Sequence, residues 1–273
     1  MSFSLVSGGQ KNLWIGRFSI FPDDMFIHGI STRYGGESTD RFEALNLGLH
    51  VGDDRDTVCH NRDVFFDGLG LVRGSGVTCQ QVHGCDIMVV NRDDIGRGMY
   101  AYDESIPNID ALITDTPELP LMLFFADCTP VLLADPVRRA IGVAHAGWKG
   151  TAAGIGMKTV QRMVREYGCK PENILASIGP AIGPCCYEVG EQVLTSFDKT
   201  FPQYKTKIFA SVGDDKYRLN LWEANRLQLL DAGLVQDNID VAGVCTACNH
   251  KQFFSYRAEG GTTGRIAAVL AIK

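Results

Sequence analysis

The sequence predicts an α+β fold in which mixed β-sheets are flanked by helices within a single domain. Several short β-prone runs follow one another without a helix between them, which argues against a regular doubly wound α/β fold. Repeats, low-complexity tracts and Pro/Ser-rich linkers are absent from the 273 residues. We therefore expect one domain over residues 11–273, preceded by a flexible N-terminal segment, residues 1–10.

The predicted strands are short runs rich in β-branched and aromatic residues, bounded by turn-forming residues. Two of them, Val77–His83 and Asp86–Val90, are expected to form a hairpin that turns at Gly84. The expected strands are Leu13–Phe18, Phe26–Thr32, Val77–His83 with Asp86–Val90, Asp110–Thr114, Leu121–Asp127, Val131–Asp135, Ile141–His145, Ile174–Ile178, Asp240–Cys245, Phe253–Tyr256 and Ile266–Ile272.

Helices are predicted where apolar residues recur at helical spacing between start and stop signals. Asp56 is expected to cap a helix that runs through Phe65 and Phe66. A longer helix is expected over Thr151–Tyr167, ended by Gly168. The remaining predicted helices are Val189–Phe197 and Leu221–Ala232.

Charge and targeting signals exclude some classes of function. The formal net charge is −6, which offers no general attraction to nucleic acid or to membrane surfaces. The N-terminus lacks the basic and apolar regions of a signal peptide, and no apolar run approaches the roughly 20 residues of a membrane span. We therefore expect a cytoplasmic protein whose nine cysteines are reduced thiols.

Three residues that can bind a metal follow or end predicted strands. They are His83 in "QQVHG", Cys128 in "ADCTP" and His145 in "AHAGW". Two imidazoles and a thiolate suit zinc and leave a fourth position for water, whose pKa the metal lowers towards neutrality. Asp127 is expected to orient one of the ligands. Ordinary packing remains the alternative for each residue taken alone, since a buried cysteine behaves as a small hydrophobe.

Motifs along nearly the whole chain resemble a bacterial family. They include "STRYGGES", "LNLGLHVGDD", "DALITD", "ADCTPVLLADP", "GVAHAGWKGT", "IGPAIGPCCYEVG" and "FFSYRAEGGTTGR". The chain resembles the laccase-domain proteins, once called polyphenol oxidases and now described as multi-substrate purine nucleoside phosphorylases. The resemblance implies a cysteine-hydrolase-like fold and a zinc ion bound by His83, Cys128 and His145; copper is a weaker candidate.

The resemblance also implies an activity. Adenosine, inosine, guanosine or S-methyl-5′-thioadenosine would react with phosphate to give a free base and (methylthio)ribose 1-phosphate, with adenosine deamination as a side activity. The expected partners are therefore a purine nucleoside and phosphate, bound by a monomer.

Phosphorolysis needs an anion site, for which basic residues within the motifs are candidates. A surface or ion-pair role is equally open for each of them. Two positions depart from the family pattern: Ala258 stands where a second arginine often follows "FFSYR", and Lys149 replaces an arginine found in other members. The candidates for binding substrate or phosphate are Arg33, Asn46, Arg62, Lys149 and Arg265.

Two cysteine motifs need separate interpretation. Cys185, in "IGPCCYEVG", precedes a predicted helix, where a thiol pKa is lowered; we assign it to the catalytic set with His83, Cys128 and His145, and expect Cys186 to pack inward. "CTACNH", from Cys245 to His250, has the spacing of half a zinc site. No second half with suitable spacing is evident, so Cys245 is expected to end a strand and Cys248 to lie in a loop.

Three other functions fit some of the same residues. In a metal-free cysteine hydrolase or deamidase, Cys128 would be the nucleophile and His145 its base. A copper-dependent polyphenol oxidase would need more histidines than the six present. A metal-binding partner protein without catalytic activity has little support, because polar loops flank the proposed ligands and suit a substrate cleft.

Overall fold

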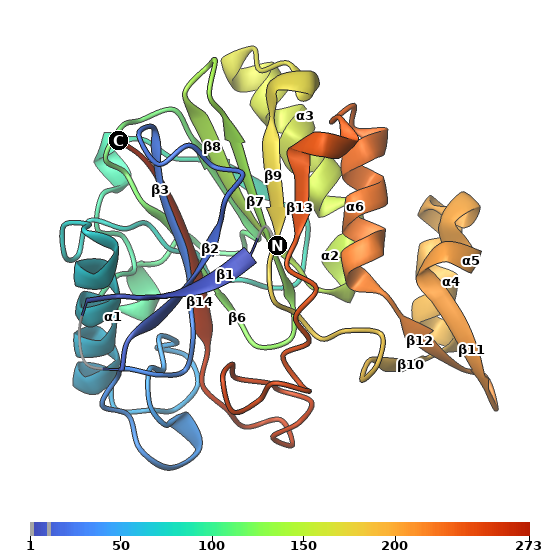
Figure 1. Ribbon diagram of the computed structural model, residues 1–273, viewed down its shortest axis with the longest axis horizontal. Helices are drawn as coiled ribbons and strands as arrows, with labels where there is room; N and C mark the ends of the chain where they lie inside the picture. Colours follow the sequence, from blue (N-terminus) through green and yellow to red (C-terminus); the bar gives the residue numbers. More distant parts are fainter. Residues whose placement is uncertain (1–2, 10–11) are drawn as a thin grey trace.

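Two β-sheets packed face to face form the centre of the molecule (Figure 1). The computed structural model describes residues 3–9 and 12–273. Sheet I is antiparallel, with the strand order β1 (Phe3–Ser7), β2 (Trp14–Phe18), β3 (Phe26–Ser31), β14 (Ile266–Ile272) and β6 (Leu121–Phe125).

Sheet II is mixed. The chain enters it directly from sheet I, because β6 of sheet I is followed within four residues by β7 of sheet II. The pairs β13–β9 and β4–β5 are parallel and the other pairs are antiparallel. The order is β13 (Ile239–Val241), β9 (Leu175–Ile178), β7 (Thr129–Asp135), β8 (Ala140–Ala146), β5 (Ala111–Thr114) and β4 (Ile87–Val89).

The central core lies between these two sheets. Leu121, Leu123 and Phe125 of β6 belong to the same buried cluster as Leu132 of β7 and Val143 of β8. Alternate residues of β6 point to the other face of sheet I, where they meet α1. Because β6 is covered on both faces, it is apolar throughout rather than alternating.

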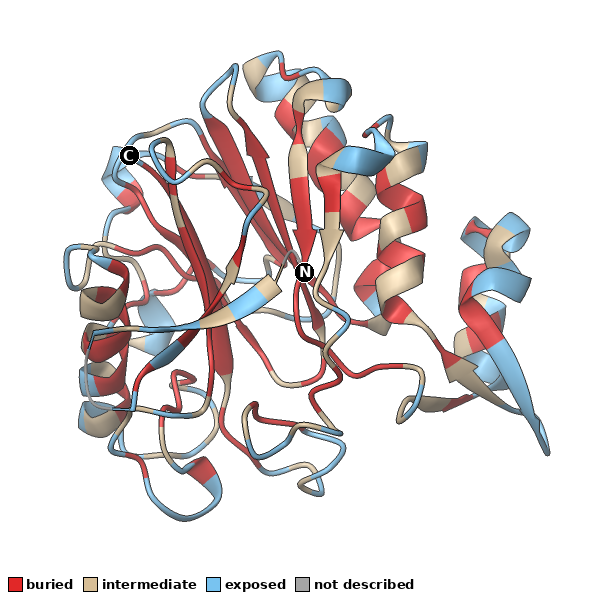
Figure 2. Cartoon of the chain, viewed as in Figure 1, coloured by how far each residue is buried: buried red, intermediate tan, exposed pale blue. Residues whose placement is uncertain are grey.

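Helices cover the outer faces of the two sheets (Figure 1). Figure 2 shows their buried sides turned towards the sheets. Helix α1 (Arg55–Leu69) packs on sheet I through residues at helical spacing that include Phe65, Phe66 and Leu69. Helices α3 (Ile155–Tyr167) and α6 (Leu221–Asp231) pack on sheet II.

A smaller unit projects beyond α6 at one end of the molecule (Figure 1). Its antiparallel sheet III has the order β10, β12, β11 and packs with two helices around Phe197, Phe209 and Leu219. The elements are β10 (Glu188–Gly190), α4 (Glu191–Thr200), α5 (Lys205–Ile208), β11 (Phe209–Gly213) and β12 (Lys216–Leu219). The predicted α+β class with mixed sheets and flanking helices is confirmed.

The structure corrects the expected ends of the chain and its helices. Phe3–Ser7, expected within a flexible segment, is strand β1 because its main chain pairs with β2; residues 1, 2 and 10 of that segment lie outside the described residues. Asp54, not Asp56, caps α1, since its carboxylate accepts the amide hydrogen of Thr57 at 2.9 Å. The expected helix over Thr151–Tyr167 is two helices, α2 (Trp148–Ala152) and α3, separated by Gly154 in the left-handed region at φ 79°.

Two expected strand arrangements are also wrong. Val77–His83 and Asp86–Val90 do not pair as a hairpin. Val77 bridges to Leu121 instead, and β4 pairs in parallel with β5. Phe253–Tyr256 was expected to be a strand, but its main chain forms bends and turns. Phe253 and Phe254 are apolar because they fill the core between the sheets.

The shifted pKa of His28, on β3, makes the stability of the fold depend on pH. The side chain is buried, its Nε2 accepts the Phe18 amide hydrogen at 2.8 Å, and its Nδ1 has no hydrogen-bond partner among the described residues. Burial, together with the charge of Arg17, lowers its pKa to about 3. The folded protein therefore holds His28 neutral where the unfolded chain protonates it.

We predict that this histidine makes the protein less stable as the pH falls from 6.5 towards 3. The unfolded chain takes up a proton in that window and the folded chain does not, so the slope contributed is at most about 1.4 kcal/mol per pH unit. Urea unfolding between pH 4 and 7 should show a flatter slope for His28→Gln than for the wild type. The exposed His60→Gln should keep the wild-type slope; equal slopes for both variants would contradict the prediction.

Candidate metal and substrate site

The candidate site lies where the chain crosses from sheet I to sheet II. Ala126, Asp127 and Cys128 make the crossing between β6 and β7. Strand β8 then places His145 opposite Pro130 of β7, two residues from Cys128. His83 comes from the loop before β4. The structure thus brings together the three expected ligands, whose ligand atoms all lie within 4.8 Å of one another.

Asp110, at the start of β5, holds two of these ligands in place. Its Oδ1 lies 2.8 Å from His145 Nδ1 and accepts the His83 amide hydrogen at 3.0 Å. Its Oδ2 accepts the amide hydrogens of Val82 and Gly84 at 3.2 and 2.7 Å. The contact with Nδ1 leaves Nε2 of His145 to face Cys128. A carboxylate that orients a ligating imidazole in this way is common in metal sites.

The loop that carries His83 needs this support. His83 itself has a φ of 61°, in the left-handed region that a residue with a side chain seldom adopts. The three amide hydrogens that Asp110 accepts come from consecutive residues of this loop, so one carboxylate stabilises the unusual conformation. His83 reaches the site with its ring 4.9 Å from that of His145, centroid to centroid.

Gly147 provides the space in which the ligands meet. A Cβ at this position would lie 2.9 Å from Cys128 Sγ and 3.0 Å from His83 Cδ2. The first distance is shorter than real Cβ contacts and the second is tighter than most of them, so any other residue would displace Cys128 and push on His83. The glycine of "AHAGW" is therefore required by the close approach of two ligands rather than by its φ of −67°.

The local charges favour an ionised thiol. Burial would raise the pKa of Cys128, but His145 and His83 beside it outweigh that effect and lower the pKa to about 6. Burial would lower the pKa of His145, whereas the Cys128 thiolate and Asp110 raise it to about 9. A thiolate and two imidazoles match the borderline-soft ligands that zinc prefers, so the residues fit a bound metal ion.

A cavity of about 520 Å³ opens beside the three ligands. That volume is within the range of small-molecule sites. His50 lines it, and burial with the charges of Arg265 and Arg62 lowers its pKa to about 4, so the imidazole is neutral at neutral pH. The lining also includes aromatic rings and two arginines, contributed by Tyr102, Phe124, Trp148, Tyr187, Tyr256, Arg257 and Arg265, together with aliphatic residues such as Ile182 and Leu221.

Of the predicted anion-binding residues, Arg265 lines the cavity. Its Nη1 donates to the carbonyl oxygens of Thr263 and Gly264 at 2.8 and 2.9 Å, and among the described residues no other atom of its guanidinium group is hydrogen-bonded. Buried Asn46 accepts the Arg265 amide hydrogen at 2.9 Å. Asn46 therefore positions the main chain of Arg265 and is itself absent from the described cavity wall.

Arg33, Arg62 and Lys149 are not among the described residues that line the cavity. Arg62 is 1% exposed and donates to the carbonyl oxygens of Leu47, Gly98 and Met99. Lys149 is exposed beside Trp148. That these three bind substrate stays a prediction, since the described structure places Arg62 in the interior and Lys149 at the surface.

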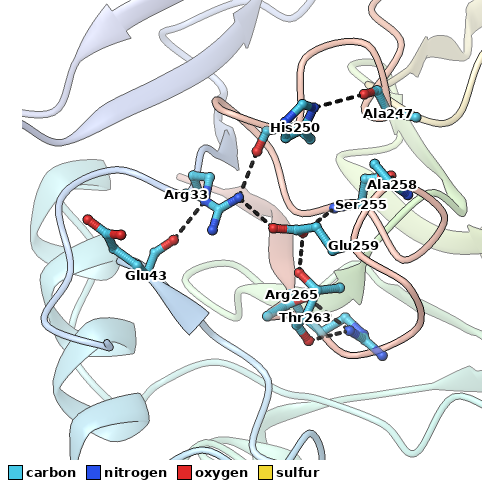
Figure 3. A network of polar contacts seen from close by, with 10 residues as sticks. Arg33, Glu43, Ala247, His250, Ser255, Ala258, Glu259, Thr263 and Arg265 are labelled. Carbon is cyan, nitrogen blue, oxygen red and sulfur yellow. Dashed lines mark hydrogen bonds and ion pairs between the residues drawn. The ribbon is translucent and has the colours of Figure 1, made fainter. Parts of the chain in front are cut away.

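Figure 3 shows the contacts that Arg33 makes. It donates to the carbonyl oxygens of Glu43 and His250 and pairs with Glu259 at 2.9 Å. Glu259 in turn accepts from Thr263, whose carbonyl oxygen binds Arg265. Arg33 thus organises the loop before β14, from which the cavity receives Arg265.

Asp127 and Cys185 also differ from expectation. Asp127 lines the cavity, but its carboxylate accepts from Thr246 Oγ1 at 2.6 Å and from the Arg257 amide at 2.7 Å; the ligand His145 is oriented by Asp110. Cys185 is exposed, lies beside Cys248 with 3.5 Å between the sulfur atoms, and is absent from the described cavity wall. A position near a helix in sequence did not bring it to the pocket.

Sequence reasoning missed four contributors to the site: Asp110, Gly147, His50 and Arg257. The first two had a usable signal. An aspartate directly before an apolar strand and a glycine two residues after a candidate ligand can both be recognised in the sequence. His50 and Arg257 come from irregular segments, and only the folded chain brings them to the cavity.

Asp110→Asn should weaken metal binding by His83, Cys128 and His145 about ten- to a hundredfold, because the ring of His145 and the loop of His83 lose their shared anion. The amide nitrogen would also face the Val82 and Gly84 amides, at a cost of roughly 1–3 kcal/mol in unfolding free energy. Chelator competition and urea unfolding measure the two effects. Asp115→Asn, exposed just beyond the same strand, is the control; matching behaviour of the two variants would refute the assigned role.

Gly147→Ala should likewise reduce metal affinity, since the new Cβ collides with two ligands. Gly190→Ala is a close control: this glycine also precedes a helix in extended conformation, at φ −89°, and a Cβ there meets nothing within 4 Å. The same competition assay should show a loss of about tenfold or more for the first variant and none for the second. Retained affinity in Gly147→Ala would show that the ligands do not need this approach.

Comparison with known proteins finds relatives of this chain in sequence and in fold. A family model described as multi-copper polyphenol oxidoreductase laccase matches residues 27–273. Purine nucleoside phosphorylase YlmD of Geobacillus stearothermophilus is 42% identical over 244 residues, 89% of each chain. Purine nucleoside phosphorylase of Bacteroides thetaiotaomicron is 33% identical over 268 residues, 98% of this chain and 99% of the relative.

Solved structures show the same fold. The crystal structure of YlmD from Geobacillus stearothermophilus matches with a TM-score of 0.94 at 39% identity, covering 100% of this chain and 99% of that chain. The structure of Bacillus licheniformis protein YfiH matches with a TM-score of 0.89 at 41% identity, over 91% and 93% of the two chains. In sequence and in fold, the chain belongs to the multi-copper polyphenol oxidoreductase laccase family.

Proposed function

We propose that the protein is a zinc-dependent purine nucleoside phosphorylase. The observation that carries the proposal is one cavity that combines a His–Cys–His metal group, aromatic walls and the partly unpaired guanidinium group of Arg265. The names of the relatives support the same reaction. Inosine, adenosine, guanosine and S-methyl-5′-thioadenosine are the proposed substrates. The protein is proposed to act as a monomer in the cytoplasm.

Each part of the cavity suits one need of phosphorolysis. A phosphate oxygen attacks C1′ of the ribose, the bond from C1′ to the base nitrogen breaks, and the base leaves with a proton. Arg265 would bind the phosphate dianion through charge-assisted hydrogen bonds. Arg257 also lines the cavity, but its guanidinium group donates to the carbonyl oxygen of Glu188. The rings of Tyr187, Tyr256 and Phe124 offer flat faces to the purine and the sugar.

The sugar develops positive charge as the glycosidic bond breaks, as in glycoside hydrolysis. The anionic phosphate held by Arg265 would stabilise that charge. His50, neutral at pH 7, offers both a hydrogen-bond donor and an acceptor to the substrate. The zinc ion, when bound by His83, Cys128 and His145, would supply a Lewis acid, which also suits adenosine deamination as a side activity.

The metal-free cysteine hydrolase is the second candidate, and one observation favours it. Asp110, His145 and Cys128 form a chain in which an oriented imidazole faces an ionised thiol, the arrangement of a cysteine nucleophile and its base. His83 distinguishes the two functions, since a nucleophile and base need no second imidazole whereas a metal does. Copper-dependent phenol oxidation has less support, because within residues 3–9 and 12–273 the histidine-containing ligand group holds two histidines.

The reaction can be tested directly. Purified protein should release hypoxanthine from inosine and form ribose 1-phosphate only when phosphate is present, as followed by chromatography. Cys128→Ala should abolish both the bound zinc of this site and the reaction, while Cys59→Ser should retain them. Base release that does not depend on phosphate, or full activity in metal-free protein with an alkylated Cys128, would overturn the proposal.

The assignment of the phosphate site makes a separate prediction. Arg265→Ala should raise KM for phosphate about ten- to a hundredfold, the equivalent of one or two charge-assisted hydrogen bonds, and change KM for inosine much less. Arg265→Lys should recover part of the loss, because charge is kept and the planar fork is not. Lys251→Ala removes an exposed cation from the neighbouring loop and should leave both constants unchanged. A larger effect on inosine than on phosphate would place Arg265 at the nucleoside instead.

A further inference from the structure

Four cysteines meet outside the cavity, and the proposed reaction uses none of them. Cys185 and Cys186 lie in the loop after β9, and Cys245 and Cys248 lie in the loop after β13. Their sulfur atoms all lie within 4.8 Å of one another. Two segments about 60 residues apart in sequence thus bring four thiols to one point, which we call the four-cysteine group.

The distances fit a metal better than disulfide bonds. The sulfur of Cys248 lies 3.5 Å from that of Cys185 and 3.4 Å from that of Cys186, whereas a disulfide joins sulfurs at about 2.05 Å. Zinc bonds to sulfur at about 2.3 Å, so four sulfurs at the corners of a tetrahedron lie about 3.8 Å apart. Small side-chain movements would bring the group to that geometry.

Main-chain donors support an anionic sulfur at Cys245. Its Sγ accepts the amide hydrogens of Gly183 at 3.2 Å and of Cys248 at 3.5 Å. One donor comes from each loop, so the sulfur is held from both sides. Hydrogen bonds to a thiolate favour its charged form, which is the form that binds metal.

Two arginines also contact the main chain of the group, one of them paired with Glu188 at 3.8 Å. Arg218 donates to the carbonyl oxygen of Cys185 at 3.0 Å, and Arg257 lies 3.5 Å from that of Cys186. Four thiolates around a divalent cation carry a net charge of −2, which two nearby guanidinium groups would offset. Simple packing does not account for the group, because Cys185 and Cys248 are exposed.

We propose that Cys185, Cys186, Cys245 and Cys248 bind one zinc ion as four thiolate ligands. The pair Cys245 and Cys248 has the C-x-x-C spacing of structural zinc sites. Its missing second half is the adjacent pair Cys185 and Cys186, which the fold supplies from another loop. This site would be closed to substrate, since its ligands fill all four positions of the metal.

The zinc ion would act as a structural link between two walls of the cavity. The loop after β9 carries Ile182 and Tyr187 to the cavity, and the loop after β13 leads to Tyr256 and Arg257. Both loops are bound to Asp127: Ile182 donates to its carbonyl oxygen at 3.0 Å, while Thr246 and Arg257 donate to its carboxylate. The metal would therefore join the two loops at a second point, in addition to their shared contacts with Asp127.

Metal analysis of untagged protein, purified with reductant and without chelator, tests the proposal. The wild type should contain two zinc ions per chain, Cys128→Ala one and Cys248→Ser one. Combining both changes should remove the metal. Cys59→Ser, which alters a half-buried thiol outside both groups, should keep two. X-ray absorption of the single zinc in Cys128→Ala should show four sulfur neighbours at about 2.3 Å.

Wild-type protein provides a reading that does not depend on any variant being folded. With both sites filled, its zinc has about 2.5 sulfur neighbours on average, against one if the His83–Cys128–His145 site alone is filled. An average near one, zinc-free Cys128→Ala, or peptide mapping that finds a disulfide among the four cysteines in place of zinc would overturn the proposal. None of these readings requires phosphorylase activity, so the two proposals can fail separately.

Discussion

The carboxylate of Asp110 is the interaction on which the site depends. It is fully buried, and burial alone would disfavour its charge. Its bond with His145 and the amide hydrogens of Gly84 and Val82 outweigh that effect and lower its pKa. One anion thereby fixes the ring of His145 and an otherwise unfavourable loop around His83. Asp110 lies at the start of β5, which pairs with β4 and β8. Sheet II therefore fixes the position of its carboxylate, and through it the positions of His83 and His145.

Asp127 has the corresponding role on the other side of the cavity. It lies in the crossing between the two sheets, next to Cys128, and its left-handed main chain, at φ 81°, turns the chain from one sheet to the other. Its oxygens bind Thr246, Arg257 and Ile182. Arg257 and Arg265, which line the cavity, come from loops, and the loops around the site are held by two aspartates at strand ends. A zinc ion in the four-cysteine group would complete this arrangement at the outer edge of the same loops.

The family description names copper, whereas we propose zinc from the chemistry of the ligands. Within the part of the chain that the structure describes, one group holds two imidazoles with a thiolate and the other holds four thiols. Neither resembles a set of several copper ions bound by many histidines. The arginine and aromatic walls of the cavity also suit an anion and a planar base better than a phenol alone. No helix of the described chain is long and apolar enough to span a membrane.

The sequence by itself determined the α+β class, most strands of the two central sheets, and the three residues of the metal group, because local periodicity and residue chemistry carry that information. Only the tertiary structure decided that Val77–His83 leaves its expected hairpin, that Arg62 serves the core, and that Cys185 joins Cys248 rather than the cavity. These outcomes depend on contacts between segments far apart in the chain: Val77 pairs with Leu121, Arg62 binds carbonyl groups near residue 98, and two cysteine pairs meet across about 60 residues. Spacing along a chain does not reveal such contacts, because they form only when distant segments come together in the fold.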